Sequence, residues 1–254
     1  MSTKTKSTSS KHSTKKPYTE SKLILDDETP WAIKEAYKTM RTNVLLSLPD
    51  KGNKVIAFTS AEPNDGKTTN AINFAISLGQ IGKRVLIIDC DLRKPAVYKS
   101  LAIKGDPGLT DVLANFATLS DSLQHIDKHG IYVLTAGSAI PDPTMILQSE
   151  KLKVMFEELS SIFDYVIVDL PPLTLVSDAI LFADKVDGYL LVVRHDDTDY
   201  RAVSDMMEQF KLAEDAKIIG FVYNGDDTQV RSKGKYGYKK YGYYKYGKYY
   251  YEEH

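Results

Sequence analysis

Hydrophobic residues form short, unbroken blocks through the middle of the chain. These blocks predict strands that are buried on both faces, at 54–60, 84–91, 131–137, 164–170, 188–194 and 217–224. The segments between them predict helices at 29–48, 67–82, 149–163, 177–184 and 199–213. Buried strands that alternate with helices predict an α/β fold, in which a mostly parallel sheet is flanked by helices on both faces.

The two ends of the chain lack this patterning. Residues 1–28 are rich in Ser, Thr and Lys, and we expect them to form a disordered basic tail. Residues 231–254 contain nine of the seventeen tyrosines, separated by Gly and Lys with neither a helical nor a strand period, which predicts a flexible tail. The expected folded domain is therefore 29–230, a length that suits one α/β domain.

The composition indicates the cellular compartment in which the protein is expected. The single cysteine, Cys90, excludes an internal disulfide and fits a reducing environment. No stretch approaches the ~20 apolar residues of a membrane span, and the N-terminus lacks the apolar core of a signal peptide. We therefore expect a soluble, cytoplasmic protein, and any membrane association would come through a partner.

A phosphate-binding pattern follows the first predicted strand. Residues 61–69 read AEPNDGKTT and match GxxxxGK[ST], except that Ala61 replaces the first glycine. The loop leads from a predicted strand into a predicted helix, which is the context in which backbone N–H groups surround phosphates. We expect Lys67 to neutralise the phosphates and Thr68 to bind Mg²⁺. The predicted nucleotide contacts are Glu62, Pro63, Asn64, Asp65, Gly66, Lys67, Thr68 and Thr69.

Three aspartates end two of the buried strands. Asp89 and Asp91 close 84–91 and are expected to point to the same side, and Asp169 closes 164–170. A buried carboxylate is costly without a compensating cation, and Mg²⁺ is a suitable one beside phosphate oxygens. We predict that Asp91, Asp169 and Thr68 hold the metal and that Asp89 acts as a base, although each aspartate could take either role.

These motifs together resemble the bacterial tyrosine kinases of capsule and exopolysaccharide synthesis. In family terms, 61–68 is similar to Walker A, 85-VLIIDCDLRKP-95 to the acidic motif Walker A′, and 165-YVIVDLPP-172 to Walker B. The pieces 108-GLTDVL-113 and 134-LTAGSAIPDP-143 also resemble the family, as does the tyrosine-rich end. The resemblance implies a P-loop fold, ATP and Mg²⁺ as cofactors, Lys67, Asp89, Asp91 and Asp169 as catalytic residues, and Asn224 on the adenine side of the nucleotide.

The same resemblance implies that the enzyme phosphorylates its own tail between subunits. The acceptors would be Tyr236, Tyr238, Tyr241, Tyr243, Tyr244, Tyr246, Tyr249, Tyr250 and Tyr251. Without a membrane span, the chain resembles the split, Firmicutes-type arrangement, in which a membrane-embedded activator recruits the kinase to the inner face of the membrane. A cognate tyrosine phosphatase is also implied, and nucleic acid is not an expected partner.

The family forms rings through an ExxRxxR motif in the helix before the P-loop. Here 35-EAYKTMR-41 retains Glu35 and Arg41 but has Lys38 at the middle position. Lysine lacks the planar, two-pronged geometry of arginine. We expect the helix 29–48 to assemble the chain into a homo-oligomeric ring. The ring could be an octamer, but Lys38 leaves the number of subunits open.

Two other functions share parts of this pattern. Cell-division and plasmid-partition ATPases carry similar Walker motifs, but usually have a lysine where this chain has Glu62, and they have no need of clustered tyrosines. A tail of Tyr and Lys could instead belong to a binding module that grips nucleic acid or polysaccharide without catalysis. The kinase interpretation accounts for both the P-loop and the tail.

Overall fold

The structure is a computed structural model that describes residues 23–48, 52–195, 197–213 and 215–225. All strands and helices named below belong to one compact unit, Met1–Asn224. A second unit, Gly225–His254, lies almost entirely outside the described residues. The sequence-based expectations for 1–22 and for the tail, with its nine tyrosines, fall outside these ranges as well.

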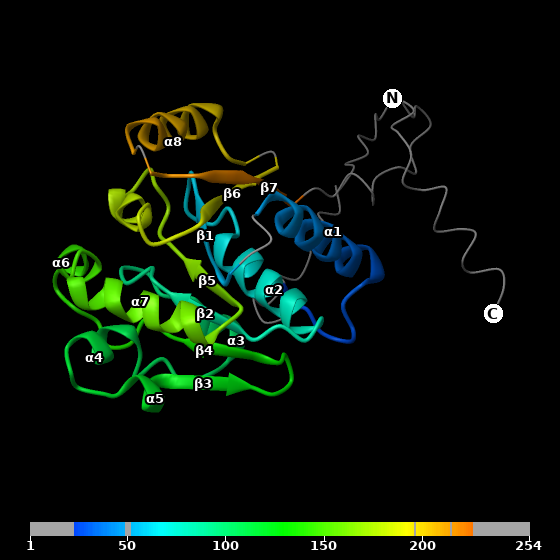
Figure 1. Ribbon diagram of the computed structural model, residues 1–254. Coiled ribbons are helices and arrows are strands. Elements are labelled where there is room, and N and C mark those ends of the chain that lie inside the picture. The colour runs from blue at the N-terminus through cyan, green and yellow to red at the C-terminus, as the bar shows by residue number, and fades with distance from the viewer. Residues whose placement is uncertain (1–22, 49–51, 196, 214, 226–254) are drawn as a thin grey trace, which may run out of the picture. The chain divides into compact units, whose positions relative to one another are not determined.

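A seven-stranded sheet forms the centre of the described unit (Figure 1). In spatial order its strands are β3 (Leu123–Ile126), β4 (Ile131–Leu134), β2 (Val85–Asp89), β5 (Tyr165–Asp169), β1 (Lys54–Ser60), β6 (Gly188–Arg194) and β7 (Ile218–Asn224). Every neighbouring pair is parallel except β3 and β4. The predicted fold class is confirmed.

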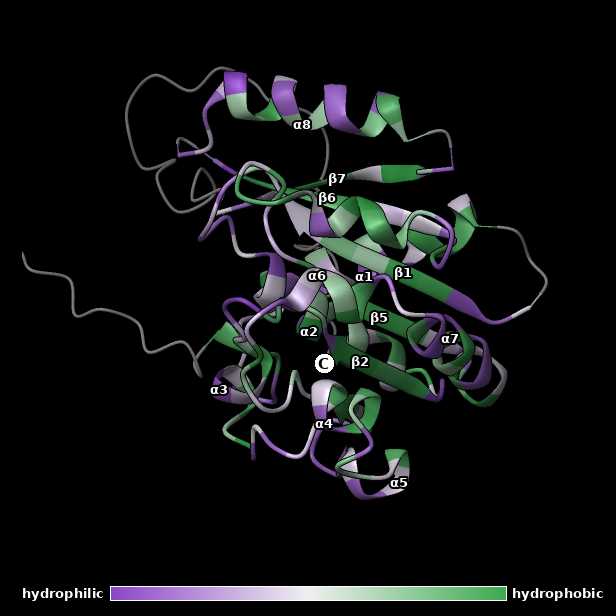
Figure 2. Cartoon of the chain, turned by 90° about the vertical axis from the view of Figure 1, so that its left-hand side faces the viewer, coloured by the Kyte–Doolittle hydropathy of each residue, from purple (hydrophilic) through white to green (hydrophobic). Residues whose placement is uncertain are grey.

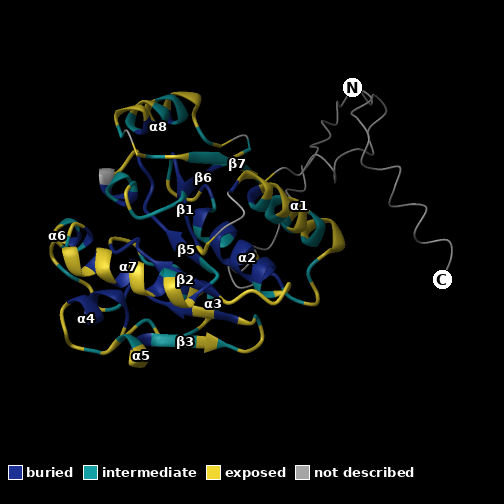
Figure 3. Ribbon diagram, in the orientation of Figure 1, coloured by how far each residue is buried: buried dark blue, intermediate teal, exposed yellow. Residues whose placement is uncertain are grey.

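Helices cover both faces of the sheet because its central strands are apolar on both sides. Along β1, Val55 and Ala57 join a core that includes residues of α4, α6, α7 and α8, whereas Ile56 and Phe58 join the core under α1, α2 and α3. Strands β2 and β5 are mostly green, whereas the outlying helix α8 carries both purple and green residues (Figure 2). Buried strands inside a rim of exposed helix faces show the same layering (Figure 3).

The helix bounds follow the predictions at the long elements. The helices are α1 (Trp31–Ser47), α2 (Lys67–Gly79), α3 (Val97–Leu101), α4 (Leu109–Leu113), α5 (Leu119–Ser122), α6 (Pro143–Leu147), α7 (Glu150–Ile162) and α8 (Tyr200–Leu212). The segment Ser177–Phe182 forms a 3-10 helix, η2, where an ordinary helix was expected at 177–184. Within the described ranges, no helix has both the length and the apolar character to cross a membrane.

Several short elements escaped the pattern. The edge strand β3 runs antiparallel to β4, and its four residues are half-buried or exposed, so it offers no apolar block to detect. Helices α3 to α6 span only four or five residues each, too few for a helical period to be visible. They fill the connections around β2, β3 and β4, which the sequence analysis left without assigned structure.

The boundary of the N-terminal tail was placed too late. Ile24 and Leu25 are 6% and 2% exposed, and both pack into the core under α1 and α2. The amide of Leu25 donates a 2.8 Å hydrogen bond to Asn73 Oδ1 on α2. Ile24 and Leu25 are enough to anchor the chain to the core, although polar residues dominate the composition of the segment 1–28. Residues 23–28 therefore belong to the folded unit.

Candidate active site

Three strand ends meet at one edge of the sheet. Strands β2, β5 and β1 are neighbours and parallel, so their carboxyl ends lie side by side. Asp169 is in register with Asp89 on one side and with Phe58 on the other, two residues before the end of β1. Ligands of open α/β sheets bind beyond such strand ends. The P-loop follows β1 directly and therefore passes over the aspartates.

The P-loop has a backbone that only a few residue types tolerate. Asn64 has φ 70° and Gly66 has φ 94°, and α2 begins at the next residue, Lys67. A Cβ on Gly66 would lie 2.1 Å from Nδ2 of Asn224, which itself donates a 2.8 Å hydrogen bond to the carbonyl of Asp65. Glycine is needed at 66 both for the left-handed backbone and for the close approach of Asn224.

This double requirement gives a stability prediction for Gly66→Ala. Gly82 also has a positive φ, of 76°, but a Cβ there would meet nothing within 4 Å. Gly82→Ala should therefore show only the backbone cost of roughly 1 kcal/mol. Gly66→Ala should lose about 1 kcal/mol more in unfolding free energy, because Asn224 must leave the Asp65 carbonyl. Equal losses in urea unfolding of the two variants would contradict the close packing at Gly66.

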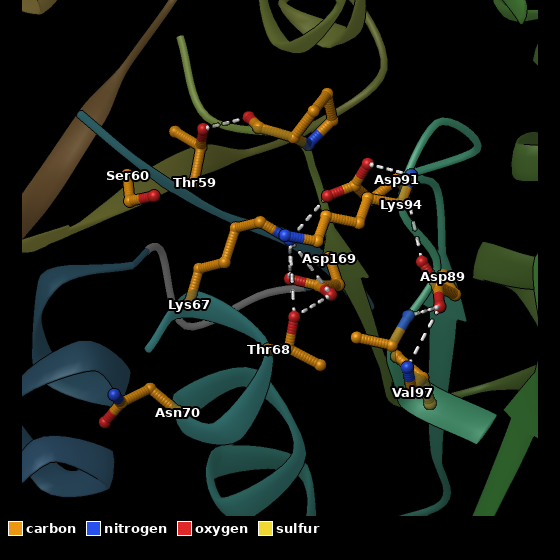
Figure 4. A network of polar contacts seen from close by, with 12 residues as sticks. Thr59, Ser60, Lys67, Thr68, Asn70, Asp89, Asp91, Lys94, Val97 and Asp169 are labelled. Atoms are coloured by element: carbon orange, nitrogen blue, oxygen red, sulfur yellow. Dashed lines mark hydrogen bonds and ion pairs between the residues drawn. The ribbon is translucent and has the colours of Figure 1, made fainter. Parts of the chain in front are cut away.

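Lys67 stands at the centre of the acidic cluster (Figure 4). Its Nζ lies 2.9 Å from Asp91 Oδ2 and 3.4 Å from Asp169 Oδ1. Burial alone would lower the pKa of Lys67, but the Asp169 and Asp91 carboxylates reverse this and raise the pKa. Lys67 therefore keeps its charge, and that charge compensates two buried carboxylates.

Asp169 also binds the residue after Lys67. The Thr68 hydroxyl donates a 2.6 Å hydrogen bond to Asp169 Oδ2. Burial raises the pKa of Asp169, while Lys67 and Thr68 act in the opposite direction. A hydroxyl and two carboxylates close to a P-loop are hard oxygen donors of the kind that suits Mg²⁺. The described residues contain no cluster of three or more His, Cys, Asp or Glu arranged for a metal, and a nucleotide-bound Mg²⁺ does not require one, since phosphates and water complete its shell.

Asp89 is held by backbone amides, whereas Asp91 pairs with Lys67. Strand β2 ends at Asp89, so Asp91 lies in the loop that follows the strand. Asp89 Oδ2 accepts hydrogen bonds from the amides of Ala96 and Val97, both 3.0 Å, and Oδ1 accepts one from the amide of Asp91 at 3.2 Å. Burial and the neighbouring Asp169 raise the pKa of Asp89 to about 7.

The P-loop is braced by the segment between β6 and α8, which the sequence analysis did not single out. The hydrogen bonds are Arg194 Nη1 to the Asn64 carbonyl at 3.0 Å, Thr198 Oγ1 to Asp65 Oδ1 at 2.7 Å, and the Asp199 amide to Glu62 Oε2 at 3.2 Å. Glu62 thus turns its carboxylate to the start of α8. More than 125 residues separate the partners, so no local pattern reveals these contacts.

Two further predicted nucleotide contacts, and an arginine that was not among the predicted site residues, surround the cluster. Pro63 is exposed, and Thr69 is half-buried in the first turn of α2. Arg93, which follows Asp91 in the same motif, donates a 2.8 Å hydrogen bond from Nε to Asp178 Oδ2 and a 3.1 Å bond to Thr144 Oγ1. Arg93 therefore ties the loop after β2 to η2 and α6.

The proposed ring motif lies on α1. Lys38 Nζ forms a 2.6 Å ion pair with Glu35 Oε1, and both side chains are part-exposed. Arg41 donates from Nη1 to the carbonyl of Ser77 on α2. Arg41 therefore holds α1 to the body of the same chain, whereas Glu35 and Lys38 bind to each other on the outer side.

Comparisons with known proteins agree on one family. A family model described as an AAA domain matches residues 53–219. The tyrosine-protein kinase YwqD of Bacillus subtilis (strain 168) is 34% identical over 81% of this chain and 86% of its own length. The kinase domain of the Escherichia coli tyrosine kinase ETK superposes with a TM-score of 0.73 at 31% identity, covering 83% of this chain and 80% of that one.

A more distant structure shows the fold alone. The septum site-determining protein MinD of Pyrococcus horikoshii OT3, complexed with Mg-ADP, has a TM-score of 0.56 at 24% identity, covering 67% of this chain and 70% of that one. The ETK kinase domain has the higher TM-score and the higher sequence identity of the two structures. The chain is a tyrosine-protein kinase, and it belongs to the bacterial tyrosine kinases of the Firmicutes type.

Proposed function

We propose that this kinase uses ATP and Mg²⁺ to phosphorylate the tyrosines of its own C-terminal tail, and so regulates synthesis and export of a capsular or extracellular polysaccharide. The observation that carries the proposal is the convergence of Lys67, Thr68, Asp91 and Asp169 where α2 begins. The sequence adds nine acceptor hydroxyls within one short stretch. The resemblance of the sequence motifs to the kinases of capsule and exopolysaccharide synthesis suggests the biological setting.

Lys67 and the backbone amides of the loop would stabilise the negative charge of the transferred phosphoryl group. Phosphoryl transfer depends mainly on position and charge neutralisation. Thr68, Asp169 and Asp91 would hold Mg²⁺, whose chemistry here is to offset phosphate charge. When a nucleotide enters, the Lys67 ammonium is already present and charged, because two carboxylates keep it so.

Asp89 would accept the proton of the incoming phenol. In the reaction, the tyrosine oxygen forms a bond to the γ-phosphorus, the bond to the ADP oxygen breaks, and the phenolic proton leaves. A phenol has a pKa near 10. A base with a pKa of about 7, as burial gives Asp89, suits proton transfer near neutral pH. Its three backbone hydrogen bonds hold the carboxylate in one orientation.

We further propose that the reaction takes place between subunits of a ring, at the cytoplasmic face of the membrane. Neighbours would dock on α1 through Glu35 and Lys38, which already pair on its exposed side. A membrane-embedded activator would recruit the chain, and a cognate phosphatase would reverse the modification. Asn224 would lie beside the nucleotide, since it contacts Gly66 and Asp65 of the P-loop.

Mass spectrometry of the purified protein tests the acceptor assignment. After incubation with ATP and Mg²⁺, phosphate should appear on tyrosines between Tyr236 and Tyr251 and not on Tyr189, whose ring is buried. Omitting Mg²⁺ should remove the signal. Phosphate confined to tyrosines of the folded domain would contradict the proposal, and a protein that binds nucleotide without any phosphotyrosine would favour a partition-type ATPase.

Activation gives a second test. The isolated chain should phosphorylate weakly, because in a split kinase the cytoplasmic end of the membrane partner completes the active form. Adding that peptide should raise the rate at least about tenfold, equivalent to ~1.4 kcal/mol of barrier. The control is the same peptide in scrambled order. Equal initial rates with and without the activator peptide would show that the chain needs no partner.

A further inference from the structure

A chain of two part-buried hydrogen bonds runs from α1 to the P-loop. The hydroxyl of Tyr37 on α1 donates to Asn70 Oδ1 on α2 at 3.0 Å, and Asn70 Nδ2 donates to the carbonyl of Gly66 at 3.0 Å. Asn70 is only 4% exposed. It lies one turn after Lys67 on α2 (Figure 4). Two side chains thus link a surface helix to the glycine of the phosphate loop.

The direction of each bond is fixed by chemistry. Asn70 uses its only amide oxygen for Tyr37 and one N–H for Gly66, so losing the phenol would free the amide to rotate. Burial raises the pKa of Tyr37, although a hydrogen bond from Asn73 acts against this, and the hydroxyl therefore stays a donor at neutral pH. Tyr37 is the residue that orients Asn70.

The Gly66 carbonyl belongs to the same rigid peptide unit as the amide of Lys67. In a planar trans peptide, the C=O and N–H bonds point in opposite directions. Holding the carbonyl toward Asn70 therefore holds the Lys67 N–H the opposite way, as an amide of the predicted phosphate cradle. The carbonyl also accepts the helical bond from the Asn70 amide at 3.0 Å, so one residue holds it twice.

We propose that Tyr37 is a positioning residue that couples helix α1 to nucleotide affinity through Asn70 and Gly66. The inference rests on the proposed function, in which the P-loop binds ATP and neighbouring subunits dock on α1. A neighbouring subunit that docks on α1 and holds it against α2 would then increase the affinity for ATP. By linkage, bound ATP would increase the affinity between the subunits by the same factor.

Tyr37→Phe tests the coupling, because it removes the hydroxyl and keeps the ring. The expected result is an ATP dissociation constant that is about three to ten times larger, the range of one net hydrogen bond. In the kinase assay, the KM for ATP should rise by a similar factor while kcat stays near the wild-type value. A merely structural role would lower the melting temperature and leave both nucleotide constants unchanged.

Ser77→Ala is the matched control on the same helix. Ser77 is 1% exposed, and its hydroxyl donates a hydrogen bond to the carbonyl of Phe74, away from Tyr37, Asn70 and Gly66. This variant should melt at a lower temperature than the wild type with an unchanged ATP dissociation constant. Equal ATP dissociation constants for folded Tyr37→Phe and Ser77→Ala would overturn the coupling.

Asn70→Ala provides a second route, which also serves if Tyr37→Phe does not fold. It should weaken ATP binding at least as much as Tyr37→Phe, and the double variant should be no weaker than Asn70→Ala, because both act through one bond to Gly66. Full additivity, or wild-type affinity in Asn70→Ala, would refute the proposal. Failure of the wild type itself to bind ATP would instead remove the proposed function.

Discussion

Lys67→Met should reduce tyrosine phosphorylation by at least about 100-fold, the scale for removing one preorganised charge-stabilising donor. Methionine has nearly the same length but no charge. The ammonium lies within 3.4 Å of carboxylates from two sequence motifs, at the start of the helix that follows the P-loop. Its removal leaves triphosphate and carboxylate charges facing each other, and nucleotide binding should weaken along with the chemistry.

The fold should survive this change. Without the lysine, the buried carboxyl of Asp169 can take up a proton, since burial already raises its pKa. The circular dichroism spectrum should therefore match that of the wild type, and thermal unfolding should remain cooperative. Phosphotyrosine is measured by radiolabel transfer from ATP, with Lys83→Met as the matched control, because Lys83 is exposed between α2 and β2. Undiminished labelling of Lys67→Met would refute the kinase mechanism proposed for this site.

The location of the site could be predicted from the sequence, because local sequence patterns and the parallel order of the strands both point to it. The apolar blocks that end in Asp89 and Asp169 define two neighbouring parallel strands, and GK[ST] after a third strand marks the loop. Parallel order then brings the strand ends together, whatever the lengths of the connections between them. The proximity of Lys67 to Asp91 and Asp169 follows from this, whereas the role of each aspartate stays a prediction.

Residues that act through long-range contacts could not be predicted in this way. Thr198 and Arg194 meet the P-loop only after the chain has crossed the sheet. Tyr37 has the spacing of an ordinary core residue on an amphipathic helix, and its hydroxyl gives no further signal in the sequence. The backbone hydrogen bonds that Asp89 accepts depend on where β2 ends, which apolar patterning does not resolve to a single residue.

The inward contact of Arg41 changes how the ring should be tested. The sequence motif includes both Glu35 and Arg41, but Arg41 binds the carbonyl of Ser77 within its own chain. Its loss would loosen α1 as well as any subunit contact. Glu35 and Lys38 pair on the outer side of the helix and are cleaner probes of a neighbour. Glu35→Ala is therefore the better choice for separating oligomer from monomer.

Replacing all nine tyrosines from Tyr236 to Tyr251 by Phe should nearly abolish phosphate incorporation while ATP binding persists. Phenylalanine keeps the aromatic ring and removes only the acceptor oxygen. Each phosphate adds about −1.5 to −2 charges, and the segment Arg231–Lys248 carries seven basic residues, so a fully phosphorylated tail would become strongly negative. Like charges on neighbouring tails would repel one another and drive subunits apart. The Phe variant should therefore stay oligomeric in ATP, where the wild type dissociates.

Light scattering beside radiolabel transfer separates the two roles of the tail. The average molar mass of the wild type should fall as radiolabel accumulates on the protein. The nine-fold Phe variant should show neither change, and Glu35→Ala should be monomeric before ATP is added. Because transfer between subunits needs an encounter, the labelling rate per molecule of Glu35→Ala should rise steeply with protein concentration. Restoring one tyrosine at a time then maps the acceptors that the kinase uses. A Phe variant that labels fully and still dissociates in ATP would show that the tail is neither acceptor nor switch.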